Sequence, residues 1–213
     1  MPSSVRALFE AVGLELSGPV RWGDLPEAHS PGVYVVAHVE DPSVASEQEP
    51  YEAHIDVARV EEWLSVATEM TLDGRRPDSA AAVCARLREF WLDDEPVLYI
   101  GATGTGRSLC ERLGDLHCHR LGERSPHRGG HWLQTLEDRR QKWVFWADVT
   151  QRGDPRRGVE QEMILAFARS VSSRSRQDLR DPDNPFPWAN LEWKPEGRRI
   201  VKNHGLAKQA RSR

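Results

Sequence analysis

Two short apolar runs, each with a tyrosine close to a glycine, constrain the fold of this chain more than any other feature. Residues 33–36 read VYVV after Gly32, and residues 97–100 read VLYI before Gly101. Short runs of β-branched and aromatic residues bounded by Gly or Pro are typical of buried strands. A third run, residues 143–149, reads WVFWADV and has the same character. We therefore expect three core strands.

Helical patterns surround these runs. Apolar spacing and capping residues predict a helix over residues 5–12, a helix that starts near Ser108, and a helix over residues 158–171. Residues 41–93, between the first two strands, are predicted as an insertion. It should hold one helix near residues 55–67 and a second helix capped by Asp78 or Ser79. The chain therefore reads as a domain of mixed α and β structure.

Composition restricts the class of protein. The 213 residues suit one domain with insertions, and the 38% hydrophobic share with eight Trp can form a core. No apolar stretch reaches the roughly 20 residues of a membrane span, and the N-terminus lacks the pattern of a signal peptide. Three cysteines without CxxC spacing favour a reducing compartment. We expect a cytoplasmic protein with no membrane contact.

The charge of the chain is unevenly distributed. The net charge is −4, and residues 41–69 are mostly acidic. Two stretches are basic. The first contains Arg107, Arg112, Arg120, Arg124 and Arg128. The second contains Lys194, Arg198, Arg199, Lys202, Lys208, Arg211 and Arg213. A basic face on an acidic protein can bind phosphate. The alternative is an ordinary solvated surface.

Polar residues follow the tyrosine runs in a defined order along the chain. They are Tyr34, Tyr99, Arg112, Glu160 and Asn190. This set resembles the GIY-YIG nuclease family. The motif residues are GVY at 32–34 and YIG at 99–101, an Arg-Leu pair at 112–113, a Glu followed by apolar residues 163 and 164, and an Asn after a proline-containing stretch.

The resemblance implies an α+β fold with a small three-stranded antiparallel sheet flanked by helices, and a helical insertion between the first two core strands. It implies a metal-dependent DNA endonuclease. Tyr34 would activate water, Tyr99 would position it, Arg112 would bind the scissile phosphate, and Glu160 would hold one Mg²⁺ or Mn²⁺. Asn190 would close the core. The nuclease domain is expected over residues 1–195, followed by a basic tail over residues 196–213.

The residue types suit phosphodiester hydrolysis. A carboxylate can hold a hard cation such as Mg²⁺ through oxygen, and an Arg can donate two parallel hydrogen bonds to phosphate. A tyrosine has a pKa of about 10, so it needs a nearby positive charge to act as a base. Four basic residues and one histidine are predicted to make further contacts with DNA. They are Arg107, His117, Arg198, Arg199 and Lys202.

Three alternatives stay open. Residues 101–108, GATGTGRS, match a phosphate-binding loop except that Arg107 replaces the lysine. A nucleotide-binding protein would use this loop. A zinc site could draw on Cys110, His117, Cys118, His119, His127 and His131, although none of these residues has finger spacing. The third alternative is a DNA-binding module of the same fold that does not cleave.

Overall fold

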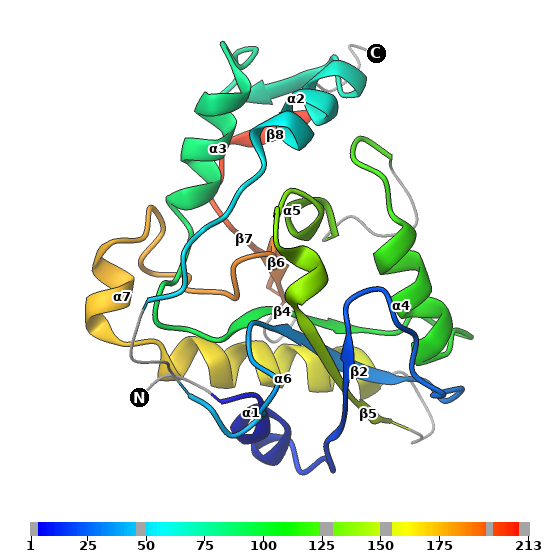
Figure 1. Cartoon of the computed structure of the whole chain (residues 1–213). Coiled ribbons are helices and arrows are strands. Elements are labelled where there is room, and N and C mark those ends of the chain that lie inside the picture. The colour runs from blue at the N-terminus through cyan, green and yellow to red at the C-terminus, as the bar shows by residue number, and fades with distance from the viewer. Residues whose placement is uncertain (1–3, 46–49, 124–129, 150–154, 195–197, 209–213) are drawn as a thin grey trace.

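The computed structural model describes residues 4–45, 50–123, 130–149, 155–194 and 198–208 (Figure 1). Its centre is a four-stranded sheet in the order β1-β5-β2-β4, in which every neighbouring pair is antiparallel. The strands are β1 (Ser17–Arg21), β5 (Trp143–Asp148), β2 (Gly32–Ala37) and β4 (Val97–Ala102).

The three predicted strands are confirmed, but the sheet has four strands rather than three. The additional strand, β1, has the sequence SGPVR and lacks an apolar run. It lies at the edge of the sheet and pairs only with β5. An edge strand is held by backbone hydrogen bonds on one side, so it needs little side-chain pattern and tolerates Gly and Pro.

The central strand β2 separates two hydrophobic clusters. Successive side chains of a strand point to opposite faces, and here Val33 and Val35 enter one cluster while Tyr34 and Val36 enter the other. All six residues of β2 are buried. The continuous apolar run that predicted this strand therefore reflects a sheet covered on both faces.

Two helices cover the face that receives Val33 and Val35. These are α6 (Pro155–Ser170) and α1 (Val5–Ala11), which pack against each other (Figure 1). Helix α1 begins at its predicted cap, because Ser4 Oγ accepts a hydrogen bond from the Ala7 N–H at 3.1 Å.

In the described part of the chain, none of the helices is both long enough and apolar enough to cross a bilayer.

The opposite face carries α4 (Leu109–Cys118), α5 (Gly130–Gln134) and the short 3-10 helix η1 (Arg139–Gln141). Helix α4 starts where the sequence predicts, because Ser108 and Glu111 form a capping box. The Ser108 hydroxyl accepts from the Glu111 N–H, and the Glu111 carboxylate accepts from the Ser108 N–H. This cap fixes the register of Arg112 on α4.

The insertion packs above this face (Figure 1). It contains α2 (Val57–Val66), β3 (Met70–Leu72) and α3 (Ala80–Arg88). Both helices were predicted, and the cap of α3 is Ser79. Strand β3 was not predicted, because it is only three residues long and pairs with β8 (Leu206–Lys208) from the C-terminal part of the chain.

The predicted basic tail, residues 196–213, is not a free tail in its described part, residues 198–208. The chain forms a hairpin from β6 (Glu192–Trp193) and β7 (Ile200–Val201), then reaches β3 through β8. Another short helix, α7 (Ser173–Gln177), follows α6. Strands β6 and β7 pair locally, whereas β8 depends on a partner, β3, that is distant in the sequence.

A buried arginine joins the C-terminal segment to the insertion. Arg86 of α3 donates to Asp73 at 3.0 and 2.6 Å and to the backbone oxygen of His204 at 3.0 Å. Gly205 has a φ of +69°, and a Cβ there would lie 2.1 Å from the Asp73 carboxylate. The insertion and the C-terminal segment therefore fold as one unit.

Candidate active site

The two motif tyrosines lie on the same face of the β2–β4 pair. Tyr34 is paired with Gly101 and Tyr99 with Val36, and the two rings are 5.9 Å apart at 41°. A Cβ at Gly101 would lie 2.6 Å from Tyr34 Cζ and Oη and from Tyr99 Cε1. The glycine of the second motif is thus required by packing, because both phenol rings occupy the space above it.

The side chains of the two tyrosines are hydrogen-bonded to each other, and Tyr34 is also hydrogen-bonded to Arg112. The pKa of Tyr34 is raised to about 12, because burial, with a smaller contribution from the charge of Glu160, outweighs the charge of Arg112 and the hydrogen bonds with Tyr99 and Arg112, which lower it. The pKa of Tyr99 is raised well above its ordinary value, first by burial and then by Tyr34 and Glu160. Without a cation at the site, both phenols therefore stay protonated at neutral pH.

The two tyrosines differ in access to solvent. Tyr34 is 0% exposed and Tyr99 is 7% exposed. Tyr99 lines the main pocket of the described structure and Tyr34 does not. The sequence-based expectation assigned water activation to Tyr34 and positioning to Tyr99. Burial favours the opposite arrangement, in which Tyr99 meets the pocket and Tyr34 lies behind it.

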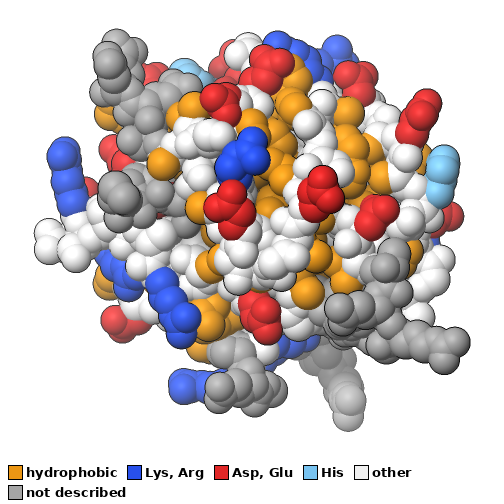
Figure 2. Space-filling view, turned by 90° about the horizontal axis from the view of Figure 1, so that it is seen from below, with side chains coloured by type: hydrophobic (Ala, Val, Ile, Leu, Met, Phe, Trp, Pro, Cys, Tyr) orange, Lys and Arg blue, Asp and Glu red, His pale blue; other side chains and the backbone are white. Residues whose placement is uncertain are grey.

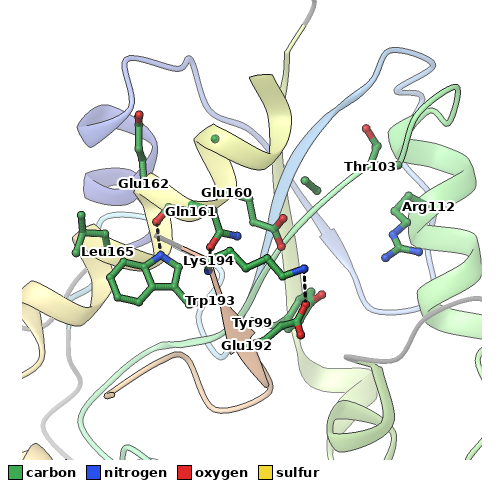
Figure 3. A pocket seen from close by; sticks show the side chains of 13 residues that line it. Tyr99, Thr103, Arg112, Glu160, Gln161, Glu162, Leu165, Glu192, Trp193 and Lys194 are labelled. Atoms are coloured by element: carbon green, nitrogen blue, oxygen red, sulfur yellow. Dashed lines mark hydrogen bonds and ion pairs between the residues drawn. The ribbon is translucent and has the colours of Figure 1, made fainter. Parts of the chain in front are cut away.

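The pocket lies along the outer edge of the sheet at β4 and has a volume of about 960 Å³. Arg112 from α4 and Glu160 from α6 lie on opposite sides of it, with Tyr99 between them (Figure 3). Tyr99, Arg112 and Glu160 come from three different elements. The structure therefore brings these three residues, which the sequence-based hypothesis assigned to one site, to the same pocket.

Two glutamates of α6, Glu160 and Glu162, line the pocket and differ in direction. Glu160 points toward Tyr99, whereas Glu162 points away from it (Figure 3). Among the residues that the structure describes, no group of three or more His, Cys, Asp or Glu side chains is arranged to hold a metal ion. A single Mg²⁺ needs no such group, because it binds through one or two carboxylates, substrate phosphates and water. The Glu160 carboxylate lines the pocket and is an oxygen donor, so it fits such an ion.

Asn190 has a structural position. Its amide oxygen accepts from the Ile100 N–H at 2.9 Å, and its amide nitrogen donates to the Ile100 oxygen at 2.8 Å. Strand β4 is at the edge of the sheet, so these bonds pair backbone groups that no neighbouring strand satisfies. Asn190 therefore holds the residue next to Tyr99, and it is not among the residues that line the pocket.

Two predicted DNA contacts near α4 are engaged within the protein. Arg107 lies 2.7 Å from the Asp115 carboxylate and 3.6 Å from that of Glu111. The ring of His117 packs on Trp22 with centroids 4.7 Å apart, and both ring nitrogens are buried. Burial lowers the pKa of His117 to about 4, opposed by the charge of Asp24. His117 is therefore neutral at pH 7 and does not face solvent with a polar atom, which contradicts its predicted role.

The predicted contacts in the C-terminal segment divide into two groups. Arg198 and Arg199 are exposed, and Arg199 is bonded to Glu192 at 2.7 Å. Lys202 is only 3% exposed, and its Nζ donates to the backbone oxygens of Pro187 and Trp188 at 3.1 and 2.8 Å. The prediction that Lys202 contacts DNA is therefore wrong for the folded chain.

Residues 101–108 do not form a phosphate-binding loop. Such a loop needs backbone N–H groups directed at the phosphate. Here the N–H groups of residues 103, 107, 108 and 109 donate to protein acceptors, namely Gly32 O, Gly104 O, the Glu111 carboxylate and Ser30 O. The strand before the loop also belongs to an antiparallel sheet, whereas such sites are built on βα units of parallel sheets.

The residues considered for a zinc site are dispersed. The Nε2 atoms of His119 and His131 lie 3.2 Å apart, and His131 stacks on Trp63. Cys118 is exposed, and Cys110 is partly buried. His127 lies outside the described residues. The paired histidines are thus packed against an aromatic side chain in the core, and the described residues contain no third ligand beside them.

The sequence hypothesis missed one wall of the pocket. Glu192, Trp193 and Lys194 line it from β6 and the residue after it. The Trp193 indole N–H donates to the Gln161 backbone oxygen at 3.1 Å, which ties β6 to α6. In a strand, Glu192 and Lys194 would point to the same face, opposite to Trp193. This alternation was the sequence signal that could have predicted a strand with two polar residues on one face.

Figure 2 shows the molecule from the side of α1 and α6. Acidic side chains surround exposed apolar atoms near the centre of this face, and the basic side chains lie mostly toward its margins. Phosphate binding requires concentrated positive charge, so this face is a poor candidate for a nucleic-acid surface. The pocket between α4 and α6 remains the best candidate site. Comparisons of the chain with protein-family models, curated proteins and solved structures found no match.

Proposed function

We propose that this protein is a divalent-metal-dependent DNA endonuclease of the GIY-YIG type. The observation that carries the proposal is the convergence of Tyr99, Arg112 and Glu160 on one pocket, with Tyr34 directly behind Tyr99. These four residues come from four elements that are spread over more than half of the chain. Ordinary core packing does not require a guanidinium and a carboxylate to meet two phenols, whereas phosphodiester hydrolysis uses all three kinds of group.

The side chains divide the work in the proposed reaction. Arg112 has five N–H donors in a planar fork, so it can bind Tyr34 and still donate to a phosphate oxygen in the pocket. Tyr99 lines the pocket, and its side chain is hydrogen-bonded to Tyr34. A water that is hydrogen-bonded to Tyr99 can therefore be oriented toward the phosphate. Tyr34 stabilises this arrangement through its hydrogen bond with Tyr99 and by accepting a hydrogen bond from Arg112.

Glu160 would hold the Mg²⁺ or Mn²⁺ ion. When bound, the ion supplies positive charge that stabilises the phosphate and the leaving oxygen. Glu160 raises the pKa values of both phenols, and a cation next to the carboxylate would offset that effect. Tyr99, which lines the pocket, would then orient water more readily.

The test of the proposed function is incubation of the full chain with supercoiled plasmid and Mg²⁺, with nicked and linear products separated on a gel. We expect nicking that EDTA abolishes. Tyr99→Phe and Arg112→Gln should remove the nicking, and Arg169→Gln, at the last turn of α6, serves as the control. Metal-dependent DNA binding without cleavage would favour the non-cleaving module, and the absence of both binding and cleavage would refute the proposal.

A further inference from the structure

The pocket extends past the proposed reaction centre toward β6. Besides Tyr99, Arg112 and Glu160, it is lined by Trp193 and Lys194. The site residues assigned from the sequence are Tyr99 of β4, Arg112 of α4 and Glu160 of α6, and none of them comes from β6. The rest of the pocket runs along α6, and Lys194 is the lysine that lines it.

Lys194 is held in the pocket by its surroundings. Its Nζ lies 3.2 Å from Glu192 Oε1, and the side chain is 50% exposed. Its backbone N–H donates to the side chain of Gln161, which lies on α6 next to Glu160. Figure 3 shows the Lys194 side chain running across the pocket toward Glu192, past Glu160.

Glu192 organises a small basic group. It accepts from Arg199 at 2.8 and 2.7 Å as well as binding Lys194. Burial alone would raise the pKa of Glu192, but the hydrogen bonds and charges of Arg199 and Lys194 outweigh it and lower the pKa. Glu192 therefore stays ionised at neutral pH. One carboxylate between two cations leaves a net charge of +1 on these three side chains, while Glu160 and Glu162 also line the pocket.

We propose that Lys194 binds the DNA phosphate next to the scissile phosphate, and that Glu192 positions Lys194 for this contact. The inference rests on the proposed function, because it takes Arg112 as the contact of the scissile phosphate. A lysine ammonium is a compact point charge with three donors. It can keep one bond to Glu192 and donate another to a phosphate oxygen.

The test is DNA binding by fluorescence anisotropy in EDTA, so that no cleavage takes place. Lys194→Gln should weaken binding of a short duplex about fivefold to tenfold and reduce the slope of log K against log salt by about 0.9. Arg75→Gln is the matched control, since Arg75 is exposed in the insertion and does not line the pocket. It removes the same charge and should change neither quantity.

A second measurement locates the contact. A single methylphosphonate is moved along one strand of the duplex, which removes one phosphate charge at a time. For the wild-type chain, one position next to the cleaved bond should weaken binding, and Lys194→Gln should abolish that loss. If Lys194→Gln binds with the wild-type slope while Arg112→Gln binds weakly, the Lys194 assignment is wrong and the proposed function stands. If the wild-type chain does not bind DNA, both are wrong.

Discussion

Gly101 lies directly opposite Tyr34 across the β2–β4 pair, and a Cβ on Gly101 would lie 2.6 Å from the Tyr34 hydroxyl. Both phenol rings therefore pack directly against the glycine that ends the second motif. It is not needed for a turn, since it lies inside β4. This relationship links a sequence motif to the spacing of the two proposed catalytic phenols.

Gly101→Ala tests that link. The added methyl group must displace Tyr34 or Tyr99, so we expect a loss of about 1–3 kcal/mol in the free energy of unfolding and loss of cleavage. Urea denaturation and the plasmid assay measure the two effects. Gly114→Ala in α4 is the control, because its Cβ would meet only Leu25 at 3.9 Å and should stabilise the helix by up to about 1 kcal/mol. Equal effects of the two substitutions would refute the packing argument.

Asn190→Ala tests the clamp on β4. The substitution leaves the Ile100 N–H and carbonyl without their side-chain partners, so we expect a loss of about 2–4 kcal/mol in unfolding free energy. Hydrogen exchange at the Ile100 amide should become faster. Asn184→Ala removes one bond, to Asp181 at 2.9 Å, and should cost less than about 1 kcal/mol. Unchanged exchange at Ile100 in Asn190→Ala would argue against a structural role.

Glu160→Gln tests the metal assignment. The substitution keeps size and removes the charge that would hold Mg²⁺, so we expect cleavage to fail while the fold survives. DNA binding in EDTA should be kept or tightened, because a negative charge next to the phosphate is gone. Glu162→Gln should be much milder, since Glu162 lies about 200° round the helix from Glu160. Cleavage by Glu160→Gln near the wild-type rate would show that the metal site lies elsewhere.

Lys202 gives a prediction about pH. Burial lowers the pKa of Lys202 to about 7, opposed by the charge of Asp181, whereas a lysine in the unfolded chain has a pKa of about 10.4. Between these two values the unfolded state binds more protons than the folded state. The contribution of Lys202 to the free energy of unfolding therefore rises with pH through this window and is constant below it.

Lys202→Met removes that contribution. Urea denaturation at about pH 6 and about pH 9 should show the wild-type chain gaining stability relative to the variant at the higher pH. Lys142, whose pKa is also lowered by burial, is present in both proteins, so its contribution cancels in the difference. A stability difference that is the same at both pH values would mean that Lys202 keeps an ordinary pKa in the folded protein.

Local sequence patterns predicted much of the fold. The apolar runs of β2, β4 and β5 and the capping residues of α1, α3 and α4 acted on near neighbours in the chain. Capping bonds and strand propensities depend on residues a few positions apart, so they can be read without the tertiary structure. The mixed α and β class follows from these elements, whereas the antiparallel arrangement of the sheet was an expectation from the resemblance to the GIY-YIG family.

The structure places the predicted site residues in different surroundings. Tyr99, Arg112 and Glu160 line one pocket, whereas Asn190 acts on the backbone of β4. Lys202 was predicted at a surface because lysine prefers water, yet its ammonium is satisfied by two carbonyl oxygens in the core. Residue type alone did not distinguish a phosphate contact from a buried structural bond.

By itself, the sequence determined the core strands, the long helices and the order of the polar residues along them, because these depend on local periodicity and capping. Only the tertiary structure decided that β1 and β8 form, since each pairs with a segment distant in the sequence. The tertiary structure also decided that Tyr99 rather than Tyr34 meets the pocket. Access to solvent depends on what packs over each ring, and that is set by elements from across the whole chain.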